Sequence, residues 1–333
     1  MNQNSERSGS LDNSAIYKKT LGFSLRRALW DLLVLLVLGG ACTAGFFIAE
    51  KTTDKGLVGL GIGAVIGIII MVIILRFVSY YLKAGQIAMM TRGIVEGELP
   101  DDVIAEGKKA VKERFTTVAV FYAATGVIKG IFNQLGRVIT RVGESVGGDA
   151  GSTVGSAIST AIQVVVSYLC DCCLGWVFYR KEVKSARATC EGAVLFFRHG
   201  KTLARNLGRI FGIGLLSLIA IGGVFGGIAW LILSRFPDTF ENLAEEISEA
   251  AARGSSKIPD FLTNPDTLVI AAAVLIGVII WSIIHSVFIR PFVLTGVLRN
   301  YINSGIDDIP DEAAFAVLDG KSAKFKKLHA ETA

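Results

Sequence analysis

The chain has 333 residues, of which 52% are apolar and 19% charged, and it contains 37 glycines. With a mean hydropathy of +0.54, this composition excludes an ordinary soluble domain and predicts an all-α polytopic membrane protein, a bundle of transmembrane helices. The net charge of +5 is accounted for by basic residues at the ends of membrane spans, so we expect no nucleic-acid partner.

Six apolar stretches are long enough to cross a bilayer, whose apolar core needs about 20 helical residues. Of the 34 Lys and Arg, 26 fall before the first stretch, in residues 76–115, in 180–209 or from 290 onward. Because basic residues concentrate on the cytoplasmic side, we expect a multi-pass cell-membrane protein with both termini cytoplasmic. The polar segment 1–28 does not predict a cleaved signal peptide. The predicted spans are residues 29–49, 57–75, 116–135, 156–178, 210–233 and 268–289.

Residues 29–115 are predicted to form a transmembrane hairpin followed by a cytoplasmic elbow. In residues 76–115 apolar residues alternate with Lys and Arg at helical spacing, which predicts interfacial elbow helices along the membrane surface. Pro100 followed by Asp101 and Asp102 predicts the start of a new helix there. A series of glycines in the second span predicts close contact with its neighbour: Gly56, Gly59, Gly61, Gly63 and Gly67.

Residues 116–209 are predicted to form a central hairpin and a basic cytoplasmic loop. In the third span Thr125, Lys129 and Asn133 are spaced four residues apart. Two interpretations stay open. The stripe lines a solute pathway, because an intramembrane Lys is costly unless it faces water or a partner. Alternatively, Lys129 is long enough to reach the nearby outer interface.

The fourth predicted span carries a small or polar residue at every fourth position from Gly143 to Gly175. Neighbouring helices should cover such a row, so we expect this helix to be the packing axis of the bundle. Gln163, Ser167 and Asp171 belong to the row and are candidates for a substrate pathway. For Asp171 the alternative is a carboxylate neutralised by a nearby Lys or Arg, with Arg180 and Lys181 two turns away.

The five cysteines do not predict a metal site or a disulfide framework. Cys170, Cys172 and Cys173 lie on one helix, where neighbouring residues point about 100° apart, and no His is close in sequence. We expect the cysteines to stay reduced and to pack as small apolar side chains.

Residues 210–309 are predicted to hold the last two spans, separated by an extracytosolic acidic helical insert at 236–266. The fifth span has two overlapping GxxxG pairs and should pack tightly. The insert is either a vestibule that attracts cations or a solvated cap. Trp281 and His285 are one turn apart in the sixth span. Either they line a cation site, or His285 is a packed, hydrogen-bonded histidine. Residues 310–333 form a cytoplasmic tail.

Two segments far apart in the chain are similar in sequence. Residues 78–102 resemble residues 288–312, with Gly85 matching Gly296 and Pro100 matching Pro310. This similarity predicts a parallel repeat, in which two like-oriented units flank the central hairpin.

Four short segments follow one another in the order Cys172-Cys173-Leu174, Glu182-Val183-Lys184, Gly192 to Phe197 and Arg205-Asn206. In this order they resemble the choline transporter-like family, over about residues 164–302. The resemblance implies that a span, an outer loop and a last span with a cytoplasmic tail follow. It also implies that Arg205 and Asn206 lie in a cytoplasmic loop.

The sequence contains no nucleotide-binding loop, zinc motif, serine elbow or paired catalytic carboxylates, so we expect no enzyme and no cofactor. The first hypothesis is a transporter or permease for a small cationic or amphiphilic solute, with Asp171 on the pathway. The second is a non-catalytic membrane scaffold or assembly factor that binds a protein partner and anionic lipid headgroups of the bilayer. A homo-oligomer fits either hypothesis. A dry interior with Asp171 salt-bridged would favour the scaffold, and a hydrated cavity open to one side the transporter.

Overall fold

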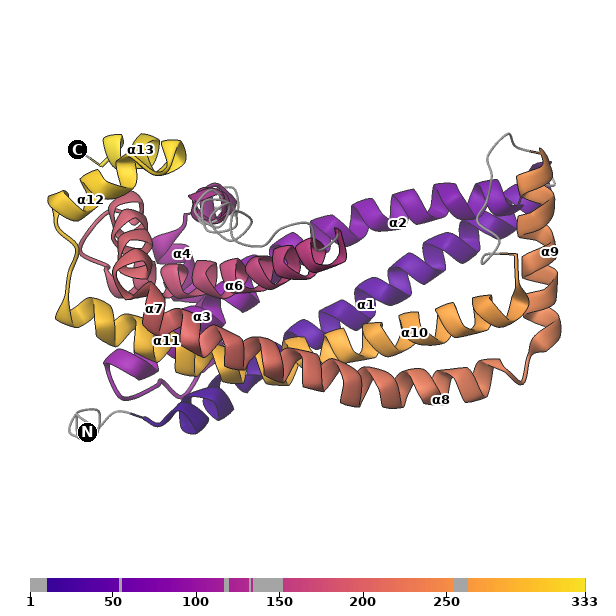
Figure 1. Ribbon diagram of the computed structural model, residues 1–333, viewed down its shortest axis with the longest axis horizontal. Helices are drawn as coiled ribbons and strands as arrows, with labels where there is room; N and C mark the ends of the chain where they lie inside the picture. The colour runs from indigo at the N-terminus through magenta and orange to yellow at the C-terminus, as the bar shows by residue number, and fades with distance from the viewer. Residues whose placement is uncertain are drawn as a thin grey trace. The chain divides into compact units, whose positions relative to one another are not determined.

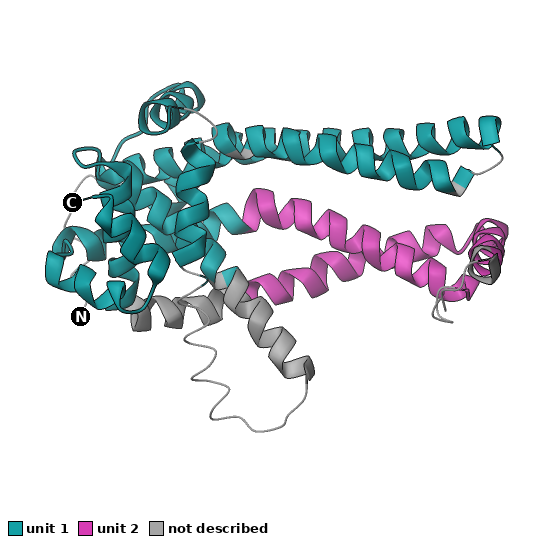
Figure 2. Ribbon diagram, turned by 90° about the horizontal axis from the view of Figure 1, so that it is seen from above, with its two compact units in different colours: residues 1–208, 290–333 teal, residues 209–289 magenta. Residues whose placement is uncertain are grey.

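The computed structural model describes residues 11–53, 56–116, 120–131, 133, 152–253 and 263–332. It is 88% helix, and no strand occurs in these ranges, which confirms the all-α prediction. The chain divides into two compact units, coloured separately in Figure 2 and described here one at a time. Unit 1 comprises Met1–Gly208 and Arg290–Ala333, and unit 2 comprises Arg209–Ile289.

Four helices are long and apolar enough to cross a membrane, so the chain is compatible with an integral membrane protein. They are Asn13–Thr53, Val58–Val95, Gly212–Leu233 and Pro265–Asp307. Two further apolar helices are shorter, Val120–Ile131 and Val166–Tyr179. These two lie within the predicted spans 116–135 and 156–178, and the total of six spans stays a prediction.

Unit 1 begins with a long helical hairpin. Its first helix, α1 (Asn13–Thr53), has 41 residues, which corresponds to about 60 Å, twice the apolar thickness of a bilayer. The first turns of α1 are buried in the unit, as Ile16 and Phe23 show, whereas Leu36 and Ile48 are at least two-thirds exposed. The change from a buried to an exposed apolar surface shows that α1 leaves the core of unit 1 and extends as an apolar helix compatible with a membrane span.

Glycines hold α1 against α2 (Gly56–Val78), and Figure 1 shows the two helices side by side. A Cβ atom added to Gly59 would lie 2.1 Å from the carbonyl oxygen of Gly45. One added to Gly63 would lie 2.2 Å from that of Ala41, whereas Gly61 has nothing within 4 Å. The predicted close contact is therefore confirmed at Gly59 and Gly63, where the two backbones touch.

After α2 the chain passes through a π-helical turn, η1 (Ser79–Lys83), into α3 (Ala84–Val95). We predicted α3 as part of an elbow along the membrane surface, but ten of its twelve residues are buried. The small residues of α3 let neighbouring helices approach on all sides. Its polar Gln86 is satisfied by protein, because Nε2 donates to Ser24 Oγ at 2.8 Å. Thus α3 is a core helix.

The next helix, α4 (Val103–Arg114), does have the surface character predicted for the elbow, since only Gly107 and Val111 are buried. The Asp102 side chain accepts a hydrogen bond from Ala105 N and so caps α4, as the Pro100–Asp102 segment predicted.

In α6 (Ser152–Tyr179) nearly every side chain from Val166 to Phe178 is buried, and the helix packs against α3 and α11 (Arg290–Asp307). For this part of the helix the predicted packing axis is confirmed; the part of the small-residue row from Gly143 to Ser159 lies outside the described side chains. The helices of unit 1 that follow α6 in the chain are α7 (Ser185–Ser217), α11 (Arg290–Asp307), α12 (Glu312–Asp319) and α13 (Ala323–Ala330). Only the part of α7 up to Gly208 belongs to unit 1.

Unit 2 is a second hairpin. The end of α7 continues through η2 (Leu218–Gly222) into α8 (Gly223–Leu233). Both η2 and α8 pack against α10 (Pro265–Ile284), which is followed by η4 (His285–Ile289). A Cβ on Gly277 would lie 2.5 Å from the carbonyl oxygen of Gly222, so the glycine pairs predicted for this span mark a real contact. The insert contains α9 (Pro237–Arg253), an amphipathic helix as predicted.

The second helix of each hairpin ends in the same order of elements, because α2–η1–α3 and α10–η4–α11 both pass through a five-residue π-turn. The predicted parallel repeat itself stays a prediction.

The glycine contacts can be tested with alanine. We expect Gly59→Ala to lower the thermal unfolding temperature in detergent micelles, because the added methyl group meets the Gly45 backbone at an overpacking cost of about 1–3 kcal/mol. Gly61→Ala is the matched control, with no neighbour within 4 Å of its Cβ. It should leave the temperature unchanged or raise it, since Ala favours a helix. Equal effects of the two substitutions would contradict the backbone contact.

Candidate functional site

The candidate site in unit 1 is centred on Asp171 of α6, whose side chain is only 4% exposed. Both carboxylate oxygens are occupied. Lys83 Nζ lies 2.6 Å from Oδ1, and Arg290 Nη2 lies 2.7 Å from Oδ2. The ion triad of Lys83, Asp171 and Arg290 therefore joins three segments that are far apart in the sequence.

Each cation of the ion triad stands next to a π-helical turn. Lys83 is the last residue of η1, and Arg290 is the first residue of α11, directly after η4. A π-turn adds a residue to the helical repeat and changes the face on which the following side chains emerge. In both places the turn comes where an apolar helix gives way to a helix buried in unit 1.

Arg290 has two further contacts that fix its guanidinium. Nη2 donates to Ser167 Oγ at 2.6 Å, and the guanidinium carbon lies 5.3 Å from the centroid of the Tyr168 ring, in cation–π geometry. Ser167, one helical turn before Asp171, is thus an acceptor within the same cluster, so the sequence row correctly placed these two residues together.

The cations that neutralise Asp171 are not the ones that its sequence neighbourhood suggested. Arg180 instead binds Glu191 of α7, with Nε at 2.8 Å from Oε2, and also contacts Glu182. The Glu191 side chain is 1% exposed and accepts a second bond from Trp176 Nε1 at 3.1 Å. Arg180 therefore neutralises the buried Glu191 near the α6–α7 turn, and Asp171 is neutralised by Lys83 and Arg290 instead.

The other candidates do not join this cluster in the described structure. Lys129 and Asn133 are exposed on and just after the helix Val120–Ile131. Three candidates lie outside the described side chains, although their backbones are helical: Gln163, Arg205 and Asn206.

Trp281 and His285 form a separate pair in unit 2. Their ring centroids are 5.1 Å apart and tilted by 36°, and Trp281 Nε1 donates to Ser217 Oγ at 3.0 Å. Trp281, His285 and Ser217 all belong to unit 2. Among the described residues, no group of three His, Cys, Asp or Glu could hold a metal ion.

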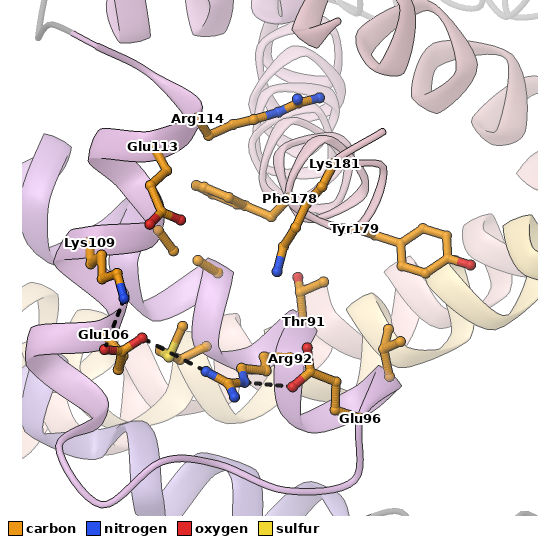
Figure 3. Close-up of a pocket in the computed structure, with 14 residues that line it drawn as sticks. Thr91, Arg92, Glu96, Glu106, Lys109, Glu113, Arg114, Phe178, Tyr179 and Lys181 are labelled. Carbon is orange, nitrogen blue, oxygen red and sulfur yellow. Dashed lines mark hydrogen bonds and ion pairs between the residues drawn. The ribbon is translucent and has the colours of Figure 1, made fainter. Parts of the chain in front are cut away.

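A charged cleft of about 480 Å³ lies between α3, α4 and the end of α6 (Figure 3). Carboxylates and cations alternate along it. Glu106 lies 3.7 Å from Lys109 and 3.9 Å from Arg92, whereas Glu113 and Lys181 make no ion pair with a described residue. Such a surface offers both charge signs to a polar partner.

The C-terminal helices α12 and α13 hold a further polar cluster, separate from the ion triad and the charged cleft. His329 lies between Asp319 Oδ2, at 3.0 Å from Nδ1, and Glu312 Oε2, at 3.1 Å from Nε2. Partial burial alone would lower the pKa of His329, but the hydrogen bonds to the two carboxylates outweigh it and hold this pKa above its usual value. The imidazolium form therefore stabilises the α12–α13 pair.

These features define a helical protein compatible with membrane insertion, whose buried charges are paired inside unit 1. Comparisons with family models, with curated proteins and with solved structures gave no match to this chain. The resemblance of residues 164–302 to the choline transporter-like family therefore stays a prediction.

The ion triad predicts a large effect of removing its central charge. Asp171→Asn should destabilise unit 1 by about 3 kcal/mol, the lower end of the range for breaking a buried pair, because both cations are partly exposed. The triple variant Lys83→Met, Asp171→Leu, Arg290→Met should recover most of this loss, because no charge is left unpaired. Thermal unfolding in detergent measures both. A triple variant that is no more stable than Asp171→Asn would contradict this account.

The His329 cluster predicts a pH dependence. Because its folded-state pKa is raised, the stabilisation is fully present below about pH 6.5 and is lost as the pH rises through the folded pKa. The protection of backbone amides in α13 against hydrogen exchange, corrected for intrinsic exchange rates, should therefore fall as the pH is raised. We expect a fall of about two- to fivefold, which is typical of an exposed ion pair. His329→Gln should show no such change. Protection that rises with pH would contradict the assigned charge.

Proposed function

We propose that this protein is a membrane scaffold, an assembly factor without a translocation path, whose apolar hairpins lie in the bilayer. In this proposal the part of unit 1 beyond its hairpin lies on the cytoplasmic side and binds a protein partner.

The observation that carries the proposal is the pairing of Asp171. A solute site needs a carboxylate that can exchange its partner for the solute. Both oxygens of Asp171 are instead held at 2.6 and 2.7 Å by Lys83 and Arg290. The surrounding side chains of α6 are closely packed, since Cys172, Cys173 and Trp176 are completely buried. A buried carboxylate held by two cations is what a structural role requires.

The position of the chain ends supports the cytoplasmic placement of this part of unit 1. Arg299 of α11 donates to Asn13 Oδ1 at 2.6 Å, at the first turn of α1. Both described ends of the chain therefore belong to the same end of unit 1, away from the tip of the α1–α2 hairpin (Figure 1). Together with the distribution of Lys and Arg, this favours both termini in the cytoplasm.

The charged cleft is the candidate surface for the partner. It is lined by groups of both signs from α3, α4 and the end of α6, and Glu113 and Lys181 point into it (Figure 3). A partner segment that carries both charge signs would match this lining, because complementary charges fix the register of an interface.

Reconstitution tests the proposal against transport. Proteoliposomes with the full-length protein should take up labelled choline and other small organic cations no faster than empty vesicles. The result contradicting the scaffold would be saturable uptake that disappears in Asp171→Asn, provided that the variant remains folded.

Partner binding gives the second readout. We expect chemical cross-linking in native membranes to trap a protein at the charged cleft, and the charge-swapped variant Glu113→Lys with Lys181→Glu to lose this product. The matched control is Lys326→Glu with Glu331→Lys, which exchanges one charge of each sign on the C-terminal tail. The same product from both swapped variants would argue against the cleft as the partner site.

A further inference from the structure

A groove on unit 1 lies outside both the ion triad and the charged cleft. It has a volume of about 640 Å³ and is bounded by α1, by α2 with η1, and by α4. Its walls are mostly apolar, with Leu29 and Trp30 on one side and Ile73 and Phe77 on the other. These four side chains are 43–67% exposed. The apolar wall is therefore open to its surroundings and is not filled by the protein itself.

Three cations line the same groove, Arg26 of α1 and Lys108 and Lys112 of α4. No carboxylate is among the lining residues, and none of the three cations makes an ion pair with a described residue. Lys112 Nζ does lie 6.0 Å from the centroid of the Tyr81 ring, over its face. The groove thus carries three positive charges that the described protein does not neutralise.

The two faces of α4 differ in a way that points to the occupant. Glu106, Lys109 and Glu113 line the charged cleft, where charges of both signs are present. Lys108 and Lys112, one turn apart, line the groove, where the charge is entirely positive. An occupant of the groove should accordingly be anionic at one end and apolar along the rest.

We propose that this groove binds one anionic glycerophospholipid. Its phosphate is held by Arg26, Lys108 and Lys112, and an acyl chain lies along the Leu29–Phe77 wall. Trp30 and Tyr81 also line the groove, and such amphipathic rings are typical of the level where headgroups meet acyl chains. Lysine and arginine clusters beside a membrane helix are the usual means of attracting anionic lipids on the cytoplasmic side. The inference requires only that α1 and α2 lie in the bilayer, so it does not depend on the scaffold function.

Native mass spectrometry of the full-length protein in detergent micelles tests the site with added phosphatidylglycerol. We expect one equivalent to bind, and to bind at least tenfold more tightly than phosphatidylcholine. The triple variant Arg26→Gln, Lys108→Gln, Lys112→Gln should lose at least tenfold in apparent affinity, because each such charge is worth about fivefold.

The control variant Lys184→Gln, Lys326→Gln, Lys327→Gln removes the same net charge from exposed positions outside both the groove and the charged cleft. It should bind phosphatidylglycerol like the natural sequence. Equal losses in the two triple variants, or equal binding of the two lipids, would overturn the proposal. Displacement of the lipid by millimolar glycerol phosphate would identify a phosphate site without a lipid, and would overturn it too.

A photoreactive phosphatidylglycerol with the reactive group on its acyl chain gives a readout that does not require a variant. Cross-links should map to the peptides that contain residues 26–30 and 73–82. Cross-links spread evenly over the exposed apolar surface of α2, α8 and α10 would show only general solvation by lipid and would contradict a defined site.

Discussion

The structure of unit 1 depends on the burial of one carboxylate. Asp171 lies in the buried second half of α6 and is satisfied only if Lys83 and Arg290 both reach it. An unpaired charge in such a place costs several kcal/mol, so arrangements that separate α3, α6 and α11 are disfavoured. The ion triad adds little net stability over an apolar core of the same volume. We therefore infer that its main effect is to fix the register in which these three helices meet.

The two π-turns make that register possible. The residues of η1 and η4 stand at the points where exposed apolar helices become helices buried in unit 1. Such a transition must turn a pattern of exposed apolar side chains into one that packs against protein within a few residues. A change in helical repeat rotates the face that the following residues present. Lys83 and Arg290 sit at these junctions and share one carboxylate.

Local signals in the sequence predicted a large part of the fold. The Pro100–Asp102 segment identified the start of α4 because capping acts within one turn. The glycines at 59 and 63 and the GxxxG pairs of the fifth predicted span identified the helix contacts, because small residues bring backbones together. The small-residue row likewise placed Ser167 and Asp171 in one cluster. The partners of Asp171 could not be predicted this way, because they come from positions 83 and 290 and are brought together only by tertiary packing. The nearer Arg180 was misleading, because Glu191 binds it.

The elbow prediction failed at α3 for a related reason. Its alternation of apolar and polar residues suits an interfacial helix, but a pattern does not distinguish lipid headgroups from protein groups as the partners of the polar side chains. Gln86 is satisfied by Ser24, and α3 is buried. The surface character expected of an elbow is instead found in α4, whose two charged faces line the charged cleft and the groove proposed to bind lipid.

The central claim, that Asp171 is a closed structural group, is tested most directly by water access beside it. In leaky proteoliposomes, where both membrane faces are reachable, a charged thiol reagent is applied to Ser167→Cys, with exposed Ala323→Cys as the reference. Peptide-level mass spectrometry measures modification at each position. The account predicts rapid modification at position 323 and none at 167 until the protein is unfolded. Modification of the two positions at similar rates in the folded protein would place water next to Asp171 and contradict the account.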